Sequence, residues 1–113
     1  MLWGCEKFDG ANTITGMWRV QEISSQGIYS VYNVSIEPFG NNDSTKFEVF
    51  NFNNSGMDIG TFVEFDGLKF KIISSPEIVS GNGVFNKETF TIDWEYYVSG
   101  NSLVAAQAHF EKP

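Results

Sequence analysis

Apolar and polar residues alternate in short stretches from residue 14 onward, and turn-forming residues separate these stretches. Residues 89–98 show the pattern most clearly, because Phe90, Ile92, Trp94 and Tyr96 share one side and threonine and acidic residues occupy the other. Alternation with a period of two is typical of a strand that buries one face and exposes the other. The recurrence of such strands at intervals of about 8 to 12 residues predicts an all-β domain.

Turn signals divide the domain into eight predicted strands. Asn53 to Gly56 and Asp66-Gly67 are hairpin signals, because Asn and Gly tolerate the positive φ of tight turns. The predicted strands are 16–24, 28–37, 46–52, 57–65, 68–74, 77–80 with a continuation to 85, 89–98 and 103–111. The three alanines in 103–109 also allow a short helix, although the Gly100-Asn101 turn before them favours a strand.

The short loops between these strands predict that each strand pairs antiparallel with the next. Eight sequential antiparallel strands close into an up-and-down β-barrel, which leaves no exposed edge. A barrel of about eight strands encloses either packed side chains or one small ligand. We therefore expect an eight-stranded antiparallel up-and-down β-barrel, with a β-sandwich as the alternative.

Length and charge narrow the function classes. The chain has 113 residues, which suggests one domain, and 16% of them are aromatic. The formal net charge is −7, and the 7 Lys and Arg residues do not cluster, so nucleic acid is not an expected partner. An acidic surface also disfavours anionic membrane surfaces. No stretch of about 18 apolar residues is present, so no transmembrane helix is predicted.

The single cysteine, Cys5, follows Leu2, Trp3 and Gly4, so an intrachain disulfide is not possible. This Leu-x-Gly-Cys run resembles the lipobox of bacterial lipoproteins, and the resemblance implies cleavage before Cys5 and a lipid on its sulfur. A chance cysteine in a tail is the alternative. The polar residues 6–13 suit a tether. We expect a lipobox-like start and flexible tether at 1–13 and a barrel domain at 14–113.

The Gly-x-Trp run of Gly16, Met17 and Trp18 enters the first predicted strand and resembles the opening motif of lipocalins. In that family the Trp closes one end of the barrel, so the resemblance implies that Trp18 is the floor and that Gly16 permits its close approach. Together with Cys5 and the tether, the chain looks like the small lipocalin-like lipoproteins of Bacteroidetes-type bacteria. The resemblance implies a lipid-anchored protein of the bacterial cell envelope, at the outer membrane or in the periplasm.

Two features depart from the lipocalin pattern. Lipocalins usually place an Arg of the last strand across the Trp, whereas this chain offers only Lys112 there. The chain is also shorter than a typical lipocalin and has no room for the C-terminal helix of that family.

Four candidate ligand-binding residues lie on faces that the alternation predicts to be buried. Glu22 shares a side with Trp18, and a buried carboxylate without a partner is costly. Either a bulge turns Glu22 outward or it points into a wet pocket. Tyr32, Trp94 and Tyr96 either line that pocket with aromatic faces and polar tips or belong to an ordinary core.

Gln107 and His109, on the last predicted strand, complete the set of candidate ligand-binding residues. They provide either polar groups in a cavity or ordinary surface side chains near the chain end. His109 is the only histidine, and no nucleophile-elbow or EF-hand pattern is present. We therefore expect no catalytic site, no metal site and no cofactor.

The sequence thus predicts a non-enzymatic, monomeric binding module that holds a small apolar or amphipathic ligand and meets the membrane only through a lipid on Cys5. The alternative is a protein- or carbohydrate-interaction domain of a surface lipoprotein with a fully packed barrel. In that case the exposed rings of Tyr29, Phe62 and Tyr97 are the candidate contact surface.

Overall fold

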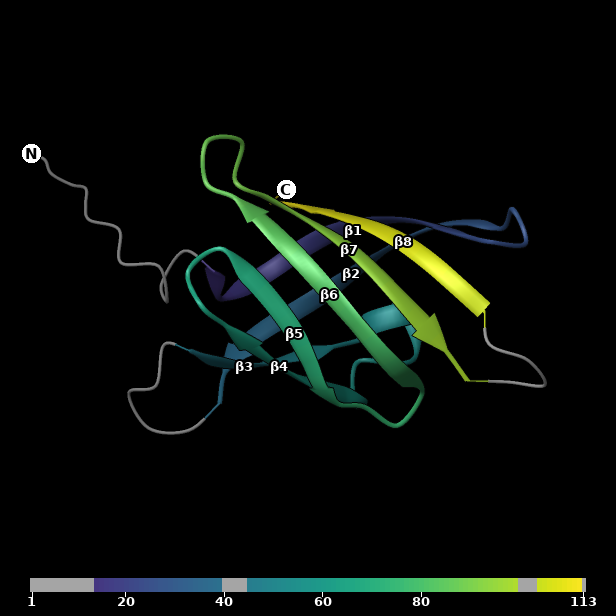
Figure 1. Ribbon diagram of the computed structural model, residues 1–113, viewed down its shortest axis with the longest axis horizontal. Helices are drawn as coiled ribbons and strands as arrows, with labels where there is room; N and C mark the ends of the chain where they lie inside the picture. Colours follow the sequence, from purple (N-terminus) through teal and green to yellow (C-terminus); the bar gives the residue numbers. More distant parts are fainter. Residues whose placement is uncertain (1–13, 40–44, 100–103, 113) are drawn as a thin grey trace, which may run out of the picture.

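The computed structural model describes residues 14–39, 45–99 and 104–112, which form one closed β-barrel (Figure 1). Each strand pairs antiparallel with its neighbour in the chain, and β1 pairs with β8 to close the barrel. The strands are β1 (Gly16–Ser24), β2 (Tyr29–Pro38), β3 (Lys46–Phe50), β4 (Gly60–Phe65), β5 (Lys69–Ser74), β6 (Ile78–Asn86), β7 (Thr91–Val98) and β8 (Val104–Glu111). The predicted eight-stranded up-and-down barrel is confirmed, and the β-sandwich alternative is wrong.

The largest departure from the predicted strands lies between β3 and β4. β3 ends at Phe50, β4 begins at Gly60, and the 3-10 turn η1 (Phe52–Asn54) lies between them. Asn51 and Asn53 have φ values of 71° and 62°, which end the extended backbone of β3. The predicted extension of these strands to residues 52 and 57 is therefore wrong.

The remaining strands differ from prediction by a few residues. β6 runs unbroken through Gly81 and Gly83, with a register shift near Ile78, so its predicted continuation is confirmed. β7 begins at Thr91 and not at residue 89, because Phe90 has a φ of 55°. β8 is a strand, so a helix in 103–109 is wrong for the described part of that range.

Trp18 closes the end of the barrel where β1 begins and β8 ends. Its side chain is fully buried, stacks on Phe90 at 5.4 Å between ring centroids, and donates from Nε1 to the Ile14 carbonyl at 2.8 Å. Lys112 Nζ lies 4.9 Å from the centroid of the Trp18 ring and donates to the Thr15 carbonyl at 2.8 Å. A lysine directly after β8 thus covers the Trp18 ring.

Gly16 fits this arrangement for two reasons. Its φ is 114°, a conformation that L side chains rarely adopt, and Lys112 Nζ lies 3.2 Å from where a Cβ would stand. Burial lowers the pKa of Lys112, as expected for an ammonium group partly removed from water.

The core occupies the barrel interior, and two glycines of β6 make room for its largest side chains. A Cβ on Gly83 would lie 2.8 Å from the Trp94 ring, and one on Gly81 would lie 2.5 Å from the Tyr96 Cβ. Two of the inward-facing residues of β8 are also small, since Ala106 pairs with Tyr96 and Ala108 with Trp94. These small residues leave space for the Trp94 and Tyr96 side chains inside the barrel.

Among the described residues, none of the helical segments has the length and apolar character needed to span a membrane.

Candidate functional site

A polar cluster lies inside the barrel, toward the end opposite Trp18, and it is built around Glu22. The pairing of β1 with β2 continues without interruption through Glu22, which stands opposite Ser30. No bulge turns Glu22 outward, and its side chain is only 8% exposed. Of the two orientations that the sequence allows, the inward one is therefore correct.

Two tyrosines hold the Glu22 carboxylate. The Tyr32 hydroxyl donates to Glu22 Oε1 at 2.5 Å, and the Tyr96 hydroxyl donates to the same oxygen. Burial raises the pKa of both phenols, and the charge of Glu22 raises each of them further, so both stay protonated as donors. No Lys, Arg or His of the described ranges forms an ion pair with Glu22.

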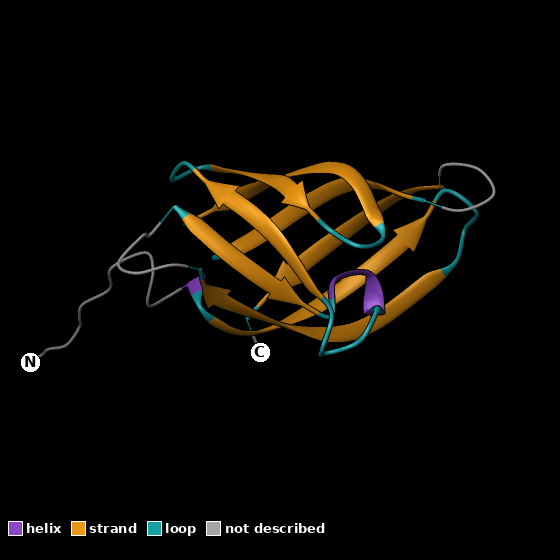
Figure 2. Ribbon diagram, turned by 90° about the horizontal axis from the view of Figure 1, so that it is seen from below, coloured by secondary structure: helices purple, strands orange, loops and turns teal. Residues whose placement is uncertain are grey.

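The turn η1 lies against this cluster and is tied to it by hydrogen bonds (the larger purple segment in Figure 2). The Asn53 backbone N–H donates to the Tyr32 hydroxyl at 3.0 Å, and the Tyr96 hydroxyl lies 3.3 Å from Asn53 Oδ1. Asn51 Nδ2 donates to the Asn33 carbonyl of β2 at 2.7 Å. The position of η1 therefore depends on the same two phenols that hold the buried carboxylate.

Phe52, at the start of η1, fills the interior space beside the cluster. It is 1% exposed, and its ring centroid lies 4.9 Å from those of Trp94 and Tyr96 and 5.4 Å from that of Phe110. Because Tyr96 contacts Phe52 with its ring and Glu22 with its hydroxyl, one tyrosine side chain spans the distance between the two.

Trp94 contributes a buried polar group that the surrounding core does not satisfy. Its Nε1 is buried and has no hydrogen-bond partner within the part of the chain that the structure describes. A buried donor without an acceptor costs about 1–3 kcal/mol. The rings of Phe52, Phe70 and Phe110 surround the indole, with centroids 4.9 to 5.5 Å away.

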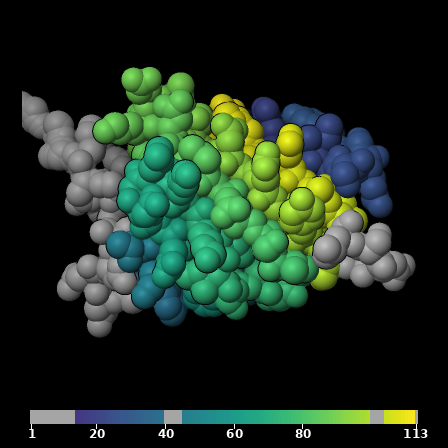
Figure 3. Space-filling model, in the orientation of Figure 1, coloured from purple at the N-terminus to yellow at the C-terminus, as the bar shows by residue number. Residues whose placement is uncertain are grey.

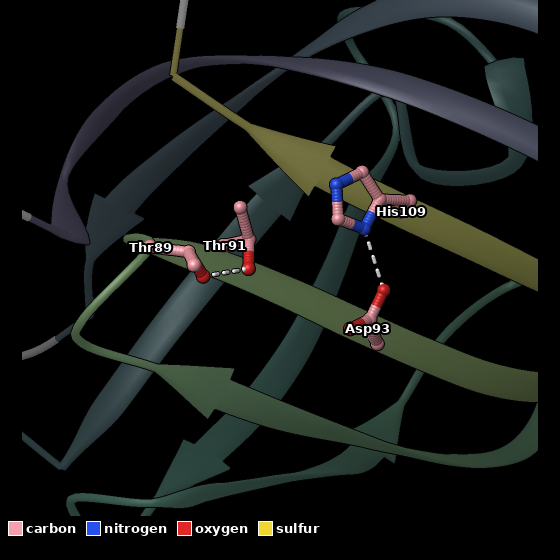
Figure 4. A network of polar contacts seen from close by, with 4 residues as sticks. All are labelled: Thr89, Thr91, Asp93 and His109. Carbon is pink, nitrogen blue, oxygen red and sulfur yellow. Dashed lines mark hydrogen bonds and ion pairs between the residues drawn. The ribbon is translucent and has the colours of Figure 1, made fainter.

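The structure brings together four of the six predicted site residues, namely Glu22, Tyr32, Trp94 and Tyr96. Gln107 and His109 instead lie on the outer face of β8, where His109 Nδ1 is 2.6 Å from Asp93 Oδ1 (Figure 4). The six residues therefore do not form a single interior site. Within the described ranges, no group of three or more His, Cys, Asp or Glu side chains is placed to hold a metal ion.

Phe52 and Asn53 belong to the site but were not predicted as members. The sequence assigned Phe52 to the end of a strand and Asn53 to a hairpin turn. The signal for their role is the aromatic residue set between asparagines, which tolerate the left-handed backbone that turns Phe52 into the barrel.

Comparisons with known proteins support the fold alone. No protein-family model and no curated protein matches the chain. The solved structure of a redesigned β-barrel, b11L5F_LGL, superposes with a TM-score of 0.60 at 14% sequence identity, covering 91% of this chain and 94% of that one. At that identity, the likeness shows a common β-barrel architecture.

Proposed function

We propose that the protein is a non-enzymatic binding module whose barrel holds one small amphipathic molecule. The head group of the ligand binds Glu22 between Tyr32 and Tyr96, and its apolar body lies among the aromatic rings of the interior. The observation that carries this proposal is the Glu22 carboxylate, which is 8% exposed and has no cationic partner in the described ranges.

The chemistry of Glu22 selects the head group. A buried carboxylate is costly unless hydrogen bonds or a cation compensate it, and two phenols supply only part of that compensation. An ammonium or hydroxyl group donates to the carboxylate, whereas an anionic head group is repelled by it. The ligand therefore carries a hydrogen-bond donor, with a protonated amine preferred.

The position of Phe52 selects the apolar body. Its ring lies between Trp94, Tyr96 and Phe110, so a ligand ring of similar size fits the same space once Phe52 moves out. Asn53 and Asn54 of η1 have left-handed φ values of 62° and 57°, and release of this backbone strain would offset part of the cost of moving Phe52. Tyr96 contacts both Phe52 and Glu22. A ligand with a phenyl ring and a two-carbon arm can match this span, with its ring in the place of Phe52 and its head group at Glu22.

Attachment to the cell envelope is the second part of the proposal. Support comes from the Trp18 floor with Lys112 across it, which fits a lipocalin-like barrel, and from the lipobox-like run before Cys5. Cys5 and the tether lie outside the described residues. Mass spectrometry of the mature protein from its natural source is expected to show a lipid on Cys5, and an unmodified Cys5 would contradict this part.

Calorimetric titration with three matched probes tests the barrel site. Phenylethylamine is expected to bind more tightly than phenylethanol, and phenylacetate is expected not to bind. Glu22→Gln should lower the affinity for the amine by about tenfold or more, because it removes the charge that the ammonium needs. Glu64→Gln, which removes an exposed carboxylate on β4, is the matched control and should bind as the wild type does.

A Phe52→Ala variant separates ligand binding from folding. Removal of the Phe52 ring leaves space inside the barrel, so the variant should bind phenylethylamine more tightly than the wild type does. A thermal melt first checks that the variant is folded. Equal binding of all three probes, or an unchanged affinity in Glu22→Gln, would contradict the proposed site.

A further inference from the structure

A groove lies on the outside of the barrel, over β1, β6, β7 and β8, and its lining also includes Glu22 and Trp94, whose side chains are buried. One hollow of about 610 Å³ is lined by residues of these strands and by Tyr29 of β2. A second hollow of about 520 Å³ extends it toward Tyr97, and the two share Asn82, Glu95 and Gln107. Figure 3 views the molecule from the side on which β6 and β7 (green to yellow-green) face the reader.

Strand register arranges the polar side chains of the groove in rows across the sheet. Gln107 of β8 stands opposite Glu95 of β7, which stands opposite Asn82 of β6. In the next row Gln21 of β1 stands opposite His109, which pairs with Asp93. Neighbouring members of a row are one strand apart, about 4.8 Å, so a ligand crossing the strands meets them in succession.

Most of these groups have unused hydrogen-bonding capacity. The amides of Gln21, Asn82 and Gln107 and the carboxylate of Glu95 form no hydrogen bond with any residue that the structure describes. An amide both donates and accepts, and a carboxylate accepts from two donors at once. Such a set matches a ligand that is dense in hydroxyl groups.

Exposed tyrosines stand at the two ends of the groove. Tyr29 is 60% exposed and lines the first hollow, and Tyr97 is 48% exposed and lines the second. An exposed aromatic face offers an apolar platform for the C–H face of a sugar ring, while the phenol hydroxyl stays available for hydrogen bonding.

Charge decides between neutral and anionic ligands. Asp93 and Glu95 lie in the groove with Lys71, which lines the second hollow opposite Asn82. Asp93 is hydrogen-bonded to His109 (Figure 4), and the chain has a net charge of −7. The two carboxylates and the net charge outweigh the one lysine and disfavour phosphate, sulfate and uronic acid groups. We infer that the outer groove is a binding site for a neutral oligosaccharide, which stacks on Tyr29 and Tyr97 and hydrogen-bonds to the amide and carboxylate rows between them.

Affinity electrophoresis with the full chain tests this site, using gels that contain a soluble β-glucan, a mannan, a xylan or the acidic polysaccharide pectate. Migration is expected to be slowed in at least one neutral gel and unchanged in the pectate gel. Tyr97→Ala and Gln107→Ala should each weaken binding by about tenfold, which corresponds to about 1.4 kcal/mol. The control is Glu64→Ala on β4, outside the groove, which should migrate in the polysaccharide gels as the wild type does.

Three results in the gels would overturn the inference. These are no retardation in any neutral gel, retardation that Tyr97→Ala and Gln107→Ala leave unchanged, and stronger retardation by pectate than by neutral polysaccharides. Capture of a protein partner that depends on Gln107, without retardation in the neutral gels, would assign the groove to a protein and would also overturn it.

Discussion

At the scale of single residues, the barrel interior combines large rings with glycines that make space for them. Gly83 is the clearest case, because a Cβ there would lie 2.8 Å from the Trp94 ring. We expect Gly83→Ala to lower the free energy of unfolding by about 1–3 kcal/mol, since the ring has to shift within a packed core. Urea denaturation measures the loss, and Ser80→Ala on the exposed side of β6 is a control expected to have little effect.

The paired phenols give the protein a specific response to alkaline pH. The pKa values of Tyr32 and Tyr96 are raised in the folded state, so the unfolded chain loses these protons first as the pH rises. Their stabilising contribution is therefore complete below the unfolded value of about 10 and is lost above it.

Urea midpoints should consequently hold steady from about pH 8 to 9 and fall with rising pH from about pH 10 upward. The double variant Tyr32→Phe with Tyr96→Phe should reduce this fall. The double variant Tyr29→Phe with Tyr97→Phe removes as many phenols from the exposed surface and should leave it unchanged. A fall that is equally steep in both double variants would show that the buried phenols are not its cause.

At the scale of elements, η1 is the part of the fold that the interior site depends on most. Asn53 has a φ of 62°, and its Oδ1 lies 3.3 Å from the Tyr96 hydroxyl. We expect Asn53→Ala to cost about 1–2 kcal/mol of stability, because alanine tolerates the left-handed conformation poorly. Asn53→Gly should cost less, since glycine accepts that backbone, and a thermal melt of the two variants compares them. An equal loss in both would mean that backbone conformation does not control this turn.

The element scale also shows where sequence patterns succeed and fail. Alternation of apolar and polar residues identified the buried faces of β2, β3 and β7. In these antiparallel strands, aromatic and aliphatic residues occupy the buried face and most residues of the solvent-exposed face are polar. It placed Gln107 and His109 on a common face but did not show that this face is external. Two of the three buried residues of β8 are Ala106 and Ala108, which give little hydrophobic contrast with their neighbours, and the third is Phe110 near the end of the strand.

The buried cluster illustrates the same limit for the candidate site. Alternation placed Glu22 on the inward side, but its partners Tyr32 and Tyr96 lie 10 and 74 positions away in the chain. Only the closure of the barrel brings β1, β2 and β7 to one oxygen atom. The insertion of Phe52 depends on consecutive left-handed residues, a backbone choice that asparagine permits without requiring.

At the scale of the whole molecule, Trp18 closes one end of the barrel with Lys112 across its ring. Trp18→Ala should lower the free energy of unfolding by about 3–5 kcal/mol, the usual cost of removing a large buried ring. Urea denaturation measures the change, and a loss below about 1 kcal/mol would show that the barrel does not depend on its floor.

The central claim is that an amphipathic molecule enters the barrel beside Glu22 and takes the place of the Phe52 ring. The indole N–H signals in a proton–nitrogen correlation spectrum, recorded as phenylethylamine is added, test it most directly. The signal of Trp94, assigned through Trp94→Phe, should shift and saturate, because Phe52 leaves its side. The signal of Trp18, whose Nε1 is bonded to the Ile14 carbonyl at the other end, should stay in place. An unmoved Trp94 signal at high amine concentration would contradict the claim.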